Sequence, residues 1–218
     1  MKITKIGHSC LVIEEEGVKI LTDPGAWTQG QNELGGLDVL LITHEHADHF
    51  HMDSIKTIVR NNPDIKIFCN RAVRKILDEE NISNDIIEDG EYMAIRNVTI
   101  EGYGKKHDKI LPELSQIENT GYRIGGKLFF PGDAFTLPKN HVDILALPIA
   151  GPWLKLSESI QYAKDMNPNI CFPIHDGMLK YFGSLYKITE KALSPNIRFI
   201  TLEEGKVYDM NEYTYHII

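Results

Sequence analysis

Three histidines and an aspartate within six residues are the part of this sequence best suited to chemistry. The segment 43–49 reads THEHADH and directly follows an apolar run. In a helix His44 and His46 would point about 200° apart, because each residue turns about 100°. In an extended segment they share one face, and a turn further on would bring Asp48 and His49 to a second ion. The spacing therefore indicates a site for two metal ions.

Four more residues of ligand type stand at the end of a predicted strand or in the loop that follows one. They are Asp23, His107, Asp133 and His175. A folded pair of sheets could bring all of them to one edge. Taken singly, each of the two aspartates would be read as a turn former, because Asp is common in turns.

The run His44-x-His46-x-Asp48-His49, with Asp23 before it and the other three residues after it, resembles the metallo-β-lactamase superfamily of hydrolases along nearly the whole chain. The resemblance implies an α/β fold, a four-layer αβ/βα sandwich of the metallo-β-lactamase type, with metals held between loops at one end of two sheets. The length of 218 residues is compatible with one domain covering residues 1–218.

The resemblance also implies a role for each ligand. The first ion would be held by His44, His46 and His107, the second by Asp48, His49 and His175, and Asp133 would bridge both. Imidazole and carboxylate ligands suit two divalent ions, with Zn²⁺ our first choice and Mn²⁺ or Fe²⁺ as alternatives. Two ions about 3.5–4 Å apart would share a water and lower its pKa, so that it attacks without a protein nucleophile.

Asp48 and Asp23 are the predicted catalytic carboxylates. Asp48 would also be a ligand, whereas Asp23 would fix a ligand or the bridging hydroxide, a contact that often matters about 10- to 100-fold. His141 is the alternative to His107, and the order of the motifs favours His107. His51 falls outside the ligand pattern, and we expect it to lie at the surface or to support a ligand.

Differences from other members of the superfamily reduce the range of reactions expected. Asp133 stands where some true β-lactamases carry cysteine, which argues against antibiotics as substrates. His46 stands where flavodiiron oxygen reductases carry glutamate, which argues against redox chemistry. Cap-domain nucleases have a long insertion before the histidine that corresponds to His175, and this sequence lacks it.

The start of the chain resembles one branch of the superfamily. The segment 6–11, IGHSCL, and the compact length are similar to the branch that contains ascorbate-6-phosphate lactonase. In that context His8 and Trp153 are candidate substrate-binding residues. For both, a side chain packed at a loop is an equally good interpretation.

The bulk properties exclude several classes of protein. The net charge is −8, and no dense run of Lys and Arg occurs, so we expect a small-molecule substrate and no nucleic acid. No apolar run approaches the roughly 18 residues of a membrane helix, so no membrane partner is expected. The first six residues alternate like a strand and not like a signal sequence, which favours a cytoplasmic location. The three cysteines form no Cys-x-x-Cys pair and are interpreted as buried thiols.

The hydrophobic periodicity predicts the elements that must position these residues. Strands are expected at 3–6, 10–14, 18–22, 38–42, 65–69, 92–95, 98–102, 122–124, 127–130, 143–147, 170–173, 198–202 and 206–208. Helices are expected from about Asp53, which is its predicted N-cap, to about 61, around 73–77, at 157–167 and at 185–193. Gly125-Gly126 suits a tight hairpin turn, and Asp176 is read as a solvated charge.

These observations favour a metal-dependent hydrolase that uses a bridging hydroxide on a small, anionic ester, lactone or phosphoester. One alternative is a phosphodiesterase that acts on RNA or cyclic nucleotides. The other is a metal-binding scaffold without turnover, which would be expected to have lost ligands. All seven ligand positions carry competent residues.

Overall fold

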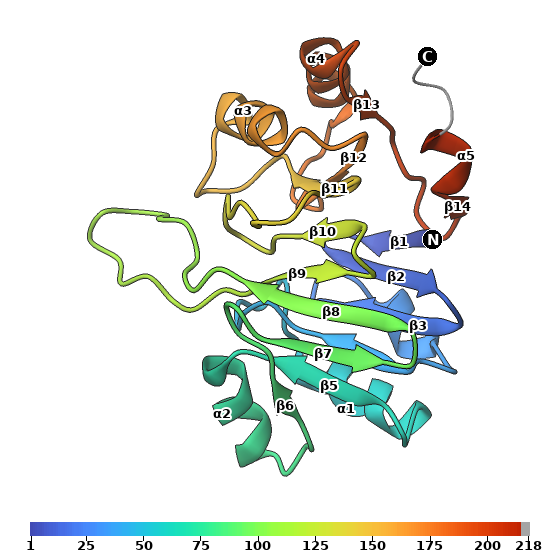
Figure 1. Ribbon diagram of the computed structural model, residues 1–218. Coiled ribbons are helices and arrows are strands. Elements are labelled where there is room, and N and C mark those ends of the chain that lie inside the picture. Colours follow the sequence, from blue (N-terminus) through green and yellow to red (C-terminus); the bar gives the residue numbers. More distant parts are fainter. Residues whose placement is uncertain (215–218) are drawn as a thin grey trace.

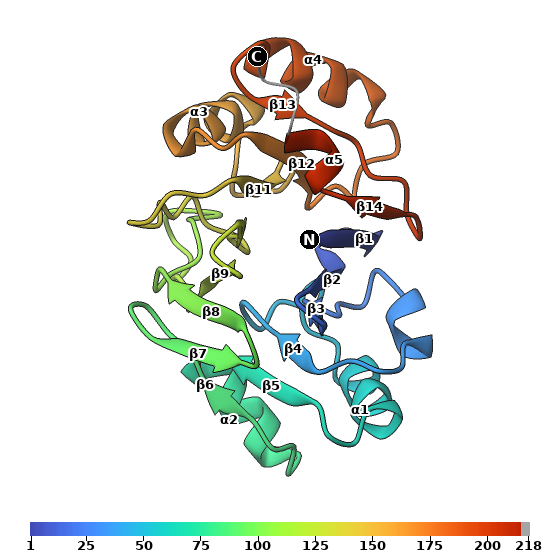
Figure 2. The same cartoon turned by 45° about the vertical axis from the view of Figure 1, so that its right-hand side comes forward.

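Two seven-stranded sheets face each other in the computed structural model, with helices on the outer side of each sheet (Figures 1 and 2). The structure describes residues 1–214. Each sheet is half antiparallel and half parallel. Parallel strands need crossover connections. In each sheet, two helices lie within the connections between parallel strands.

The first sheet has the order β14-β1-β2-β3-β4-β5-β6. Its strands are β1 (Lys2–Gly7), β2 (Cys10–Glu15), β3 (Val18–Thr22), β4 (Val39–Leu41), β5 (Lys66–Cys69), β6 (Asp85–Ile86) and β14 (Val207–Asp209). Strands β1 to β3 form an antiparallel meander, and β3 to β6 pair in parallel. Helices α1 (Met52–Asn61) and α2 (Arg71–Glu79) connect the parallel strands.

The second sheet has the order β13-β12-β11-β10-β9-β8-β7 and repeats this pattern. Its strands are β7 (Tyr92–Ile95), β8 (Val98–Tyr103), β9 (Gly121–Ile124), β10 (Leu128–Phe130), β11 (Ile144–Pro148), β12 (Ile170–Ile174) and β13 (Arg198–Phe199). Helices α3 (Leu156–Met166) and α4 (Gly183–Leu193) accompany its parallel half. The predicted hairpin joins β9 and β10, but its connection has three residues, Gly125, Gly126 and Lys127, so the prediction of a two-residue turn was wrong. Gly125 and Gly126 have φ of 59° and 70°, which glycine adopts readily.

Three apolar layers hold the four structural layers together. The central layer lies between the sheets and contains Leu41 from the first and Phe172 from the second. On the outer face of the first sheet, Ile55 of α1 packs with Leu40, and on the outer face of the second sheet Tyr162 of α3 packs with its own cluster. The three cysteines are free and buried in these layers, as predicted.

The elements agree closely with the periodicity, and the differences are local. Helix α1 begins at Met52, and its N-cap is His51, so the prediction that Asp53 is the N-cap was wrong. Asp53 lies in the first turn instead, where a carboxylate interacts favourably with the helix dipole. The strand expected at 198–202 is reduced to Arg198–Phe199. Short elements without a periodic pattern were not predicted: the 3-10 helix η1 (Gly30–Glu33), β6 and α5 (Asn211–Thr214).

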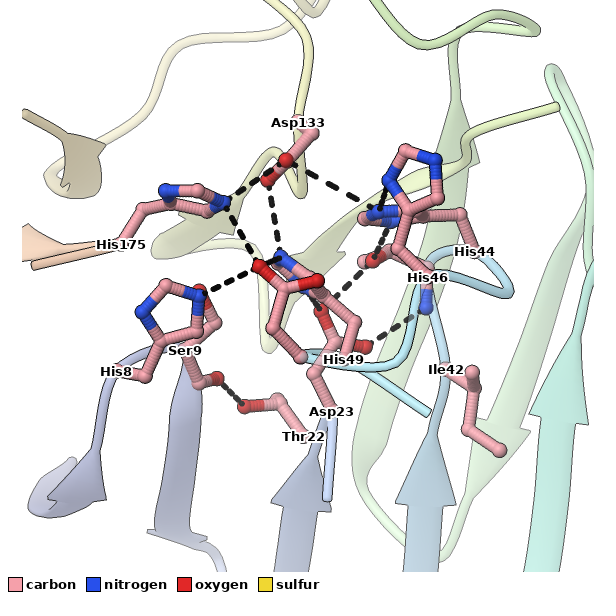
Figure 3. A network of polar contacts seen from close by, with 12 residues as sticks. His8, Ser9, Thr22, Asp23, Ile42, His44, His46, His49, Asp133 and His175 are labelled. Atoms are coloured by element: carbon pink, nitrogen blue, oxygen red, sulfur yellow. Dashed lines mark hydrogen bonds and ion pairs between the residues drawn. The ribbon is translucent and has the colours of Figure 1, made fainter. Parts of the chain in front are cut away.

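The strands of both sheets end at a shared edge, and the predicted site residues follow those ends (Figure 3). His8 follows β1, Asp23 follows β3, residues 44–49 follow β4, His107 follows β8, Asp133 follows β10 and His175 follows β12. Among residues 1–214, no helix is both long and apolar enough to cross a membrane.

Candidate metal centre

The seven predicted ligands and His8, which was predicted to bind substrate, lie together at this edge in two adjoining groups. One group contains His44, His46, His107 and Asp133, and the other contains His8, Asp48, His49 and His175. Within each group the possible ligand atoms lie within 4.8 Å of one another. The sandwich therefore brings five chain segments together around two candidate metal-binding positions.

Asp133 lies between the two groups, as a bridging ligand would. Its Oδ2 is 2.9 Å from Nε2 of His175, and its Oδ1 is 3.2 Å from Nε2 of His49 (Figure 3). Its Oδ2 also lies 3.3 Å from Nε2 of His107. The backbone N–H of Asp133 donates to Oδ1 of Asn119 at 3.0 Å. Gly132 has φ of 63°, and a Cβ there would lie 2.3 Å from the same amide oxygen, so this approach requires glycine.

Three site residues occupy the left-handed backbone region, which non-glycine residues rarely adopt. They are His8 with φ of 48°, Asp23 with φ of 36° and His175 with φ of 57°. Each stands directly after a strand, where the chain turns sharply toward the shared edge. Such conformations cost on the order of 1–3 kcal/mol each and persist where the surroundings impose them, commonly at functional sites.

Three histidines direct their Nε2 atoms to the centre because an oxygen atom holds Nδ1 of each ring. Nδ1 of His49 lies 2.7 Å from Oδ2 of Asp23, and Nδ1 of His107 and of His175 lie 2.5 Å from the backbone oxygens of Asp108 and Ala150. Because these oxygens only accept, Nδ1 carries the proton in each ring. Nε2 of the neutral ring is then an acceptor, as a metal ligand must be.

Asp23 is fully buried and contacts both His49 and Thr43, the residue that precedes His44. Its carboxylate accepts from the backbone N–H of Thr43 at 2.8 Å, from Oγ1 of Thr43 at 2.7 Å and from His49. Thr43 was not singled out from the sequence, although its position just before His44 at a strand end was visible. Asp23 therefore holds the ring of His49, and its catalytic role stays a prediction.

The donor set fits metal ions. The Nε2 atoms of His49, His107 and His175 and Oδ1 of Asp133 are buried without a hydrogen-bond partner among the described residues. These lone pairs face one another, which is unfavourable unless a cation lies between them. A buried unsatisfied polar group costs about 1–3 kcal/mol, and coordination to an ion would remove that cost.

Burial and neighbouring charges shift the pKa values of the candidate ligands in different directions. Burial lowers the pKa of His49, but the carboxylates of Asp133 and Asp23 outweigh it and hold this pKa well above 6.5. Burial lowers the pKa of His44 well below its ordinary 6.5, and the nearby His49 adds to this effect. Burial raises the pKa of Asp133, but the charges of His49 and His175 outweigh it and hold the pKa well below 3.8. Neutral imidazole and ionised carboxylate are the coordinating forms, so a bound cation would displace the proton of His49.

His8 uses both ring nitrogens within the protein. Its Nδ1 accepts from the backbone N–H of Gly177 at 3.1 Å, so the proton of the neutral ring is on Nε2, which lies 3.1 Å from Oδ2 of Asp48. Burial lowers the pKa of His8 to about 4, which keeps the ring neutral. In this arrangement His8 orients Asp48, and its predicted contact with substrate stays a prediction.

Other residues considered from the sequence lie elsewhere. His51 contacts Oγ of Ser54 at 3.0 Å. His141 is exposed and lies 3.4 Å from Asp143, so the structure brings His107 and not His141 to the centre.

The interpretation of Asp176 as a solvated charge was wrong. Its side chain is buried, and its carboxylate lies 2.5 Å from Nζ of Lys5 and accepts from the hydroxyl of Tyr186. Sequence reasoning also missed Lys5, which is buried on β1. The sequence feature that could have indicated this buried lysine is its position inside a predicted strand.

A cavity of about 150 Å³ adjoins the first group of ligands. His46 and His107 form one side, and the loop 108–117 forms the other. Its apolar lining comes from Ile110, Leu114 and Ile117. The cavity is therefore a small, largely apolar space next to two of the candidate metal ligands.

Comparison with known proteins agrees with this geometry. The family profile of the beta-lactamase superfamily domain matches residues 2–175. A Mycobacterium tuberculosis protein is 32% identical over 200 residues, covering 87% of this chain and 93% of the relative. A UPF0173 metal-dependent hydrolase of Methanobrevibacter smithii is 25% identical and covers 99% of both chains.

Solved structures share the fold. A metallo hydrolase from Ignicoccus hospitalis has a TM-score of 0.76 at 20% identity, covering 95% of this chain and 98% of its own. An isothiocyanate hydrolase from Delia radicum gut bacteria has a TM-score of 0.72 at 14% identity, covering 96% and 99%. At these identities the likeness concerns the fold alone, and it confirms the predicted α/β sandwich. The chain belongs to the beta-lactamase superfamily of metal-dependent hydrolases.

Proposed function

We propose that this protein hydrolyses a small, anionic ester, lactone or phosphoester at a site that holds two divalent metal ions. The observation that carries the proposal is the set of buried, unpartnered Nε2 and carboxylate oxygen atoms that face one another at the shared sheet edge. His44, His46 and His107 would hold one ion and Asp48, His49 and His175 the other, with Asp133 shared. Zn²⁺ is our first choice and Mn²⁺ or Fe²⁺ the alternatives.

When bound, such ions supply a water of lowered pKa and positive charge to stabilise an oxyanion. The protein holds the ligand side chains in position. Asp23 holds His49 through Nδ1, and His8 holds Asp48 through Oδ2. Asp133 is fixed by Asn119 through its backbone N–H. We assign Asp23 and Asp48 as the catalytic carboxylates on these contacts.

Two features support a small, anionic substrate. An apolar cavity of about 150 Å³ is comparable to one that accepts benzene, so the cavity beside His46 and His107 would take a group of roughly six heavy atoms. Lys109 at this cavity is exposed and has no hydrogen bond or ion pair with residues 1–214. Its free ammonium group would attract an anionic substituent. The net charge of −8 disfavours an extended nucleic acid, and a cytoplasmic location remains our expectation.

Elemental analysis is the first test of the proposal. Protein purified without chelators or a metal-binding tag should contain close to two equivalents of Zn, Mn or Fe. Asp133→Ala should lose metal and hydrolysis, because Asp133 contacts both groups. His51→Ala is the matched control, since His51 belongs to neither group. No metal in the wild-type protein, even after reconstitution, would overturn the proposal and favour the scaffold.

A substrate panel then tests the reaction class. The metal-loaded protein should hydrolyse simple lactones, aryl esters or bis-p-nitrophenyl phosphate. Activity confined to short RNA or cyclic nucleotides would replace the proposed substrate class with the phosphodiesterase alternative.

A further inference from the structure

The indole N–H of Trp153 is buried without a partner. The residue is 7% exposed, and its Nε1 has no hydrogen-bond partner among the described residues. Tryptophan Nε1 is a donor only, and buried indole N–H groups usually find an acceptor. A donor left unpaired beside a candidate active site indicates that its acceptor is a ligand.

The indole ring lies between the two groups of candidate ligands. Its centroid is 5.8 Å from the ring of His107, in the first group, and 5.9 Å from the ring of His175, in the second. Both contacts are edge-on, with interplanar angles of 72° and 81°. Phe135 packs against the indole at 5.2 Å and helps to fix its position.

Gly151 allows the N–H edge of the indole and the ring of His175 to lie close together. A Cβ on Gly151 would lie 2.9 Å from Nε1 and 3.2 Å from Cδ1 of Trp153, and 3.3 Å from Cε1 of His175. The N–H edge of Trp153 and the imidazole edge of His175 therefore both lie against residue 151. Only glycine at this residue permits so close an approach, which places the unpaired N–H beside a candidate metal ligand.

We propose that Trp153, over Gly151 and beside His175, forms a subsite that binds a negatively charged oxygen of the substrate through its Nε1–H. This proposal rests on the proposed function and extends it to one atom. The oxygen belongs to a carboxylate, to a phosphate or to the oxyanion that develops when a carbonyl or phosphoryl group is attacked. A negatively charged acceptor is favoured because such hydrogen bonds are roughly twice as strong as neutral ones, and donors placed at a developing charge stabilise the transition state.

Nuclear magnetic resonance of the indole groups tests the subsite directly. The chain contains two tryptophans, Trp27 and Trp153, so the zinc-loaded protein should give two indole N–H resonances. The variant Trp27→Phe assigns them. Inorganic phosphate is the probe. We expect the Trp153 proton to move to lower field in a saturable manner. A Trp153 resonance that stays in place at every phosphate concentration the protein tolerates would overturn the proposal.

Two variants separate this role from packing. Trp153→Phe keeps an aromatic ring and loses the N–H, so phosphate affinity should fall about 10- to 100-fold. We expect the melting temperature of this variant to match that of the wild type. A lower melting temperature would indicate that the N–H stabilises the fold. Gly151→Ala keeps the N–H, but its Cβ would lie 2.9 Å from Nε1 and displace the indole, so it should also weaken phosphate binding while the metal content stays unchanged. Wild-type phosphate affinity in both variants would contradict the subsite.

The outcomes distinguish this inference from the proposed function. Turnover of the substrate panel without any response of the Trp153 resonance would remove the subsite and leave the hydrolase intact. A saturable response together with no turnover would support an oxyanion subsite in a protein that does not hydrolyse the panel.

Discussion

At the scale of the residue, the centre depends on which ring nitrogen carries the proton. His49, His107 and His175 each place Nδ1 against an oxygen that only accepts, and each leaves Nε2 free. Two of these oxygens are backbone carbonyls, which no substitution removes. The third belongs to Asp23, so this histidine depends on a side chain that can be changed.

We expect Asp23→Asn to weaken metal binding about 10- to 100-fold, the range typical of residues that orient a ligand. The amide oxygen of Asn can accept from Thr43 or from His49, but its NH₂ group would then face a donor. Competition with a chromogenic chelator measures the affinity. Asp64→Asn makes the same change at an exposed position and should bind metal like the wild type. Equal affinity in all three proteins would remove Asp23 from the site.

At the scale of the element, the segment between β8 and β9 carries a ligand and a wall of the cavity. In Figure 1 this loop extends away from the sandwich. Its base is closed by the backbone bond from His107 N–H to the Ile117 oxygen at 3.1 Å and by Gln116, whose amide donates to the His107 oxygen at 2.9 Å. The loop therefore positions His107 and shapes the space next to it.

Filling this cavity should change substrate selection. We expect Leu114→Trp to raise KM for substrates with a phenyl-sized group and to leave those with a methyl group nearly unchanged. Leu111→Trp is the matched control, because Leu111 is also 52% exposed but does not line the cavity. Steady-state kinetics on phenyl and methyl esters measures the effect. A similar KM for phenyl esters in both variants would show that substrate does not enter the cavity.

At the scale of the whole molecule, ion pairs with at least one buried partner join the two sheets. Lys5 of β1 is 2% exposed, and its Nζ lies 2.5 Å from Asp176, just after β12, and 3.0 Å from the Pro173 oxygen. On β2, Glu15 contacts Lys127 at 2.5 Å, next to β10, and the N-terminal ammonium group at 3.0 Å. These contacts add to the apolar layer between the sheets.

Removing one partner of the buried pair should destabilise the fold. We expect Lys5→Met to lower the free energy of unfolding by about 3–5 kcal/mol, because Asp176 would keep a buried charge without its partner. Urea denaturation measures this change. Lys2→Met on the same strand is the exposed control and should have little effect. The double variant Lys5→Met/Asp176→Asn should recover part of the loss, and a loss as large as in the single variant would contradict the explanation.

The Glu15 contacts predict a pH dependence of stability. Burial raises the pKa of Glu15, but its hydrogen bonds with Lys127 and the N-terminus outweigh burial and hold the pKa below the ordinary 4.5. A carboxylate with a lowered pKa in the folded state stabilises the protein above its unfolded pKa, and this contribution is lost as the pH falls below that value.

Glu15→Gln should therefore be less stable than the wild type at neutral pH. The difference should shrink as the pH falls from about 4.5 through the lower folded pKa. Thermal unfolding measured across this range checks the prediction, with the exposed neighbour Glu16→Gln as the control. A difference that is constant with pH would exclude the Glu15 charge as its source.

The sequence by itself determined the superfamily, the order of the main strands and helices, and the residues that could bind metal. These follow from local information: alternation in β1 to β3, the Gly125-Gly126 turn, and ligand-type residues at the ends of predicted strands. His8, His51 and Asp176 could not be placed in this way, because each acquires its partners from residues distant in the chain.

Only the tertiary structure decided how the centre is built. It brought His107 and not His141 to the motif, paired Asp176 with Lys5 across the sheets, and turned His8 toward Asp48. It also left the indole N–H of Trp153 without an acceptor beside His175. The physical reason is that a strand pattern fixes where a side chain leaves the sheet, whereas its protonation state and its partners depend on what the facing sheet and its loops place there.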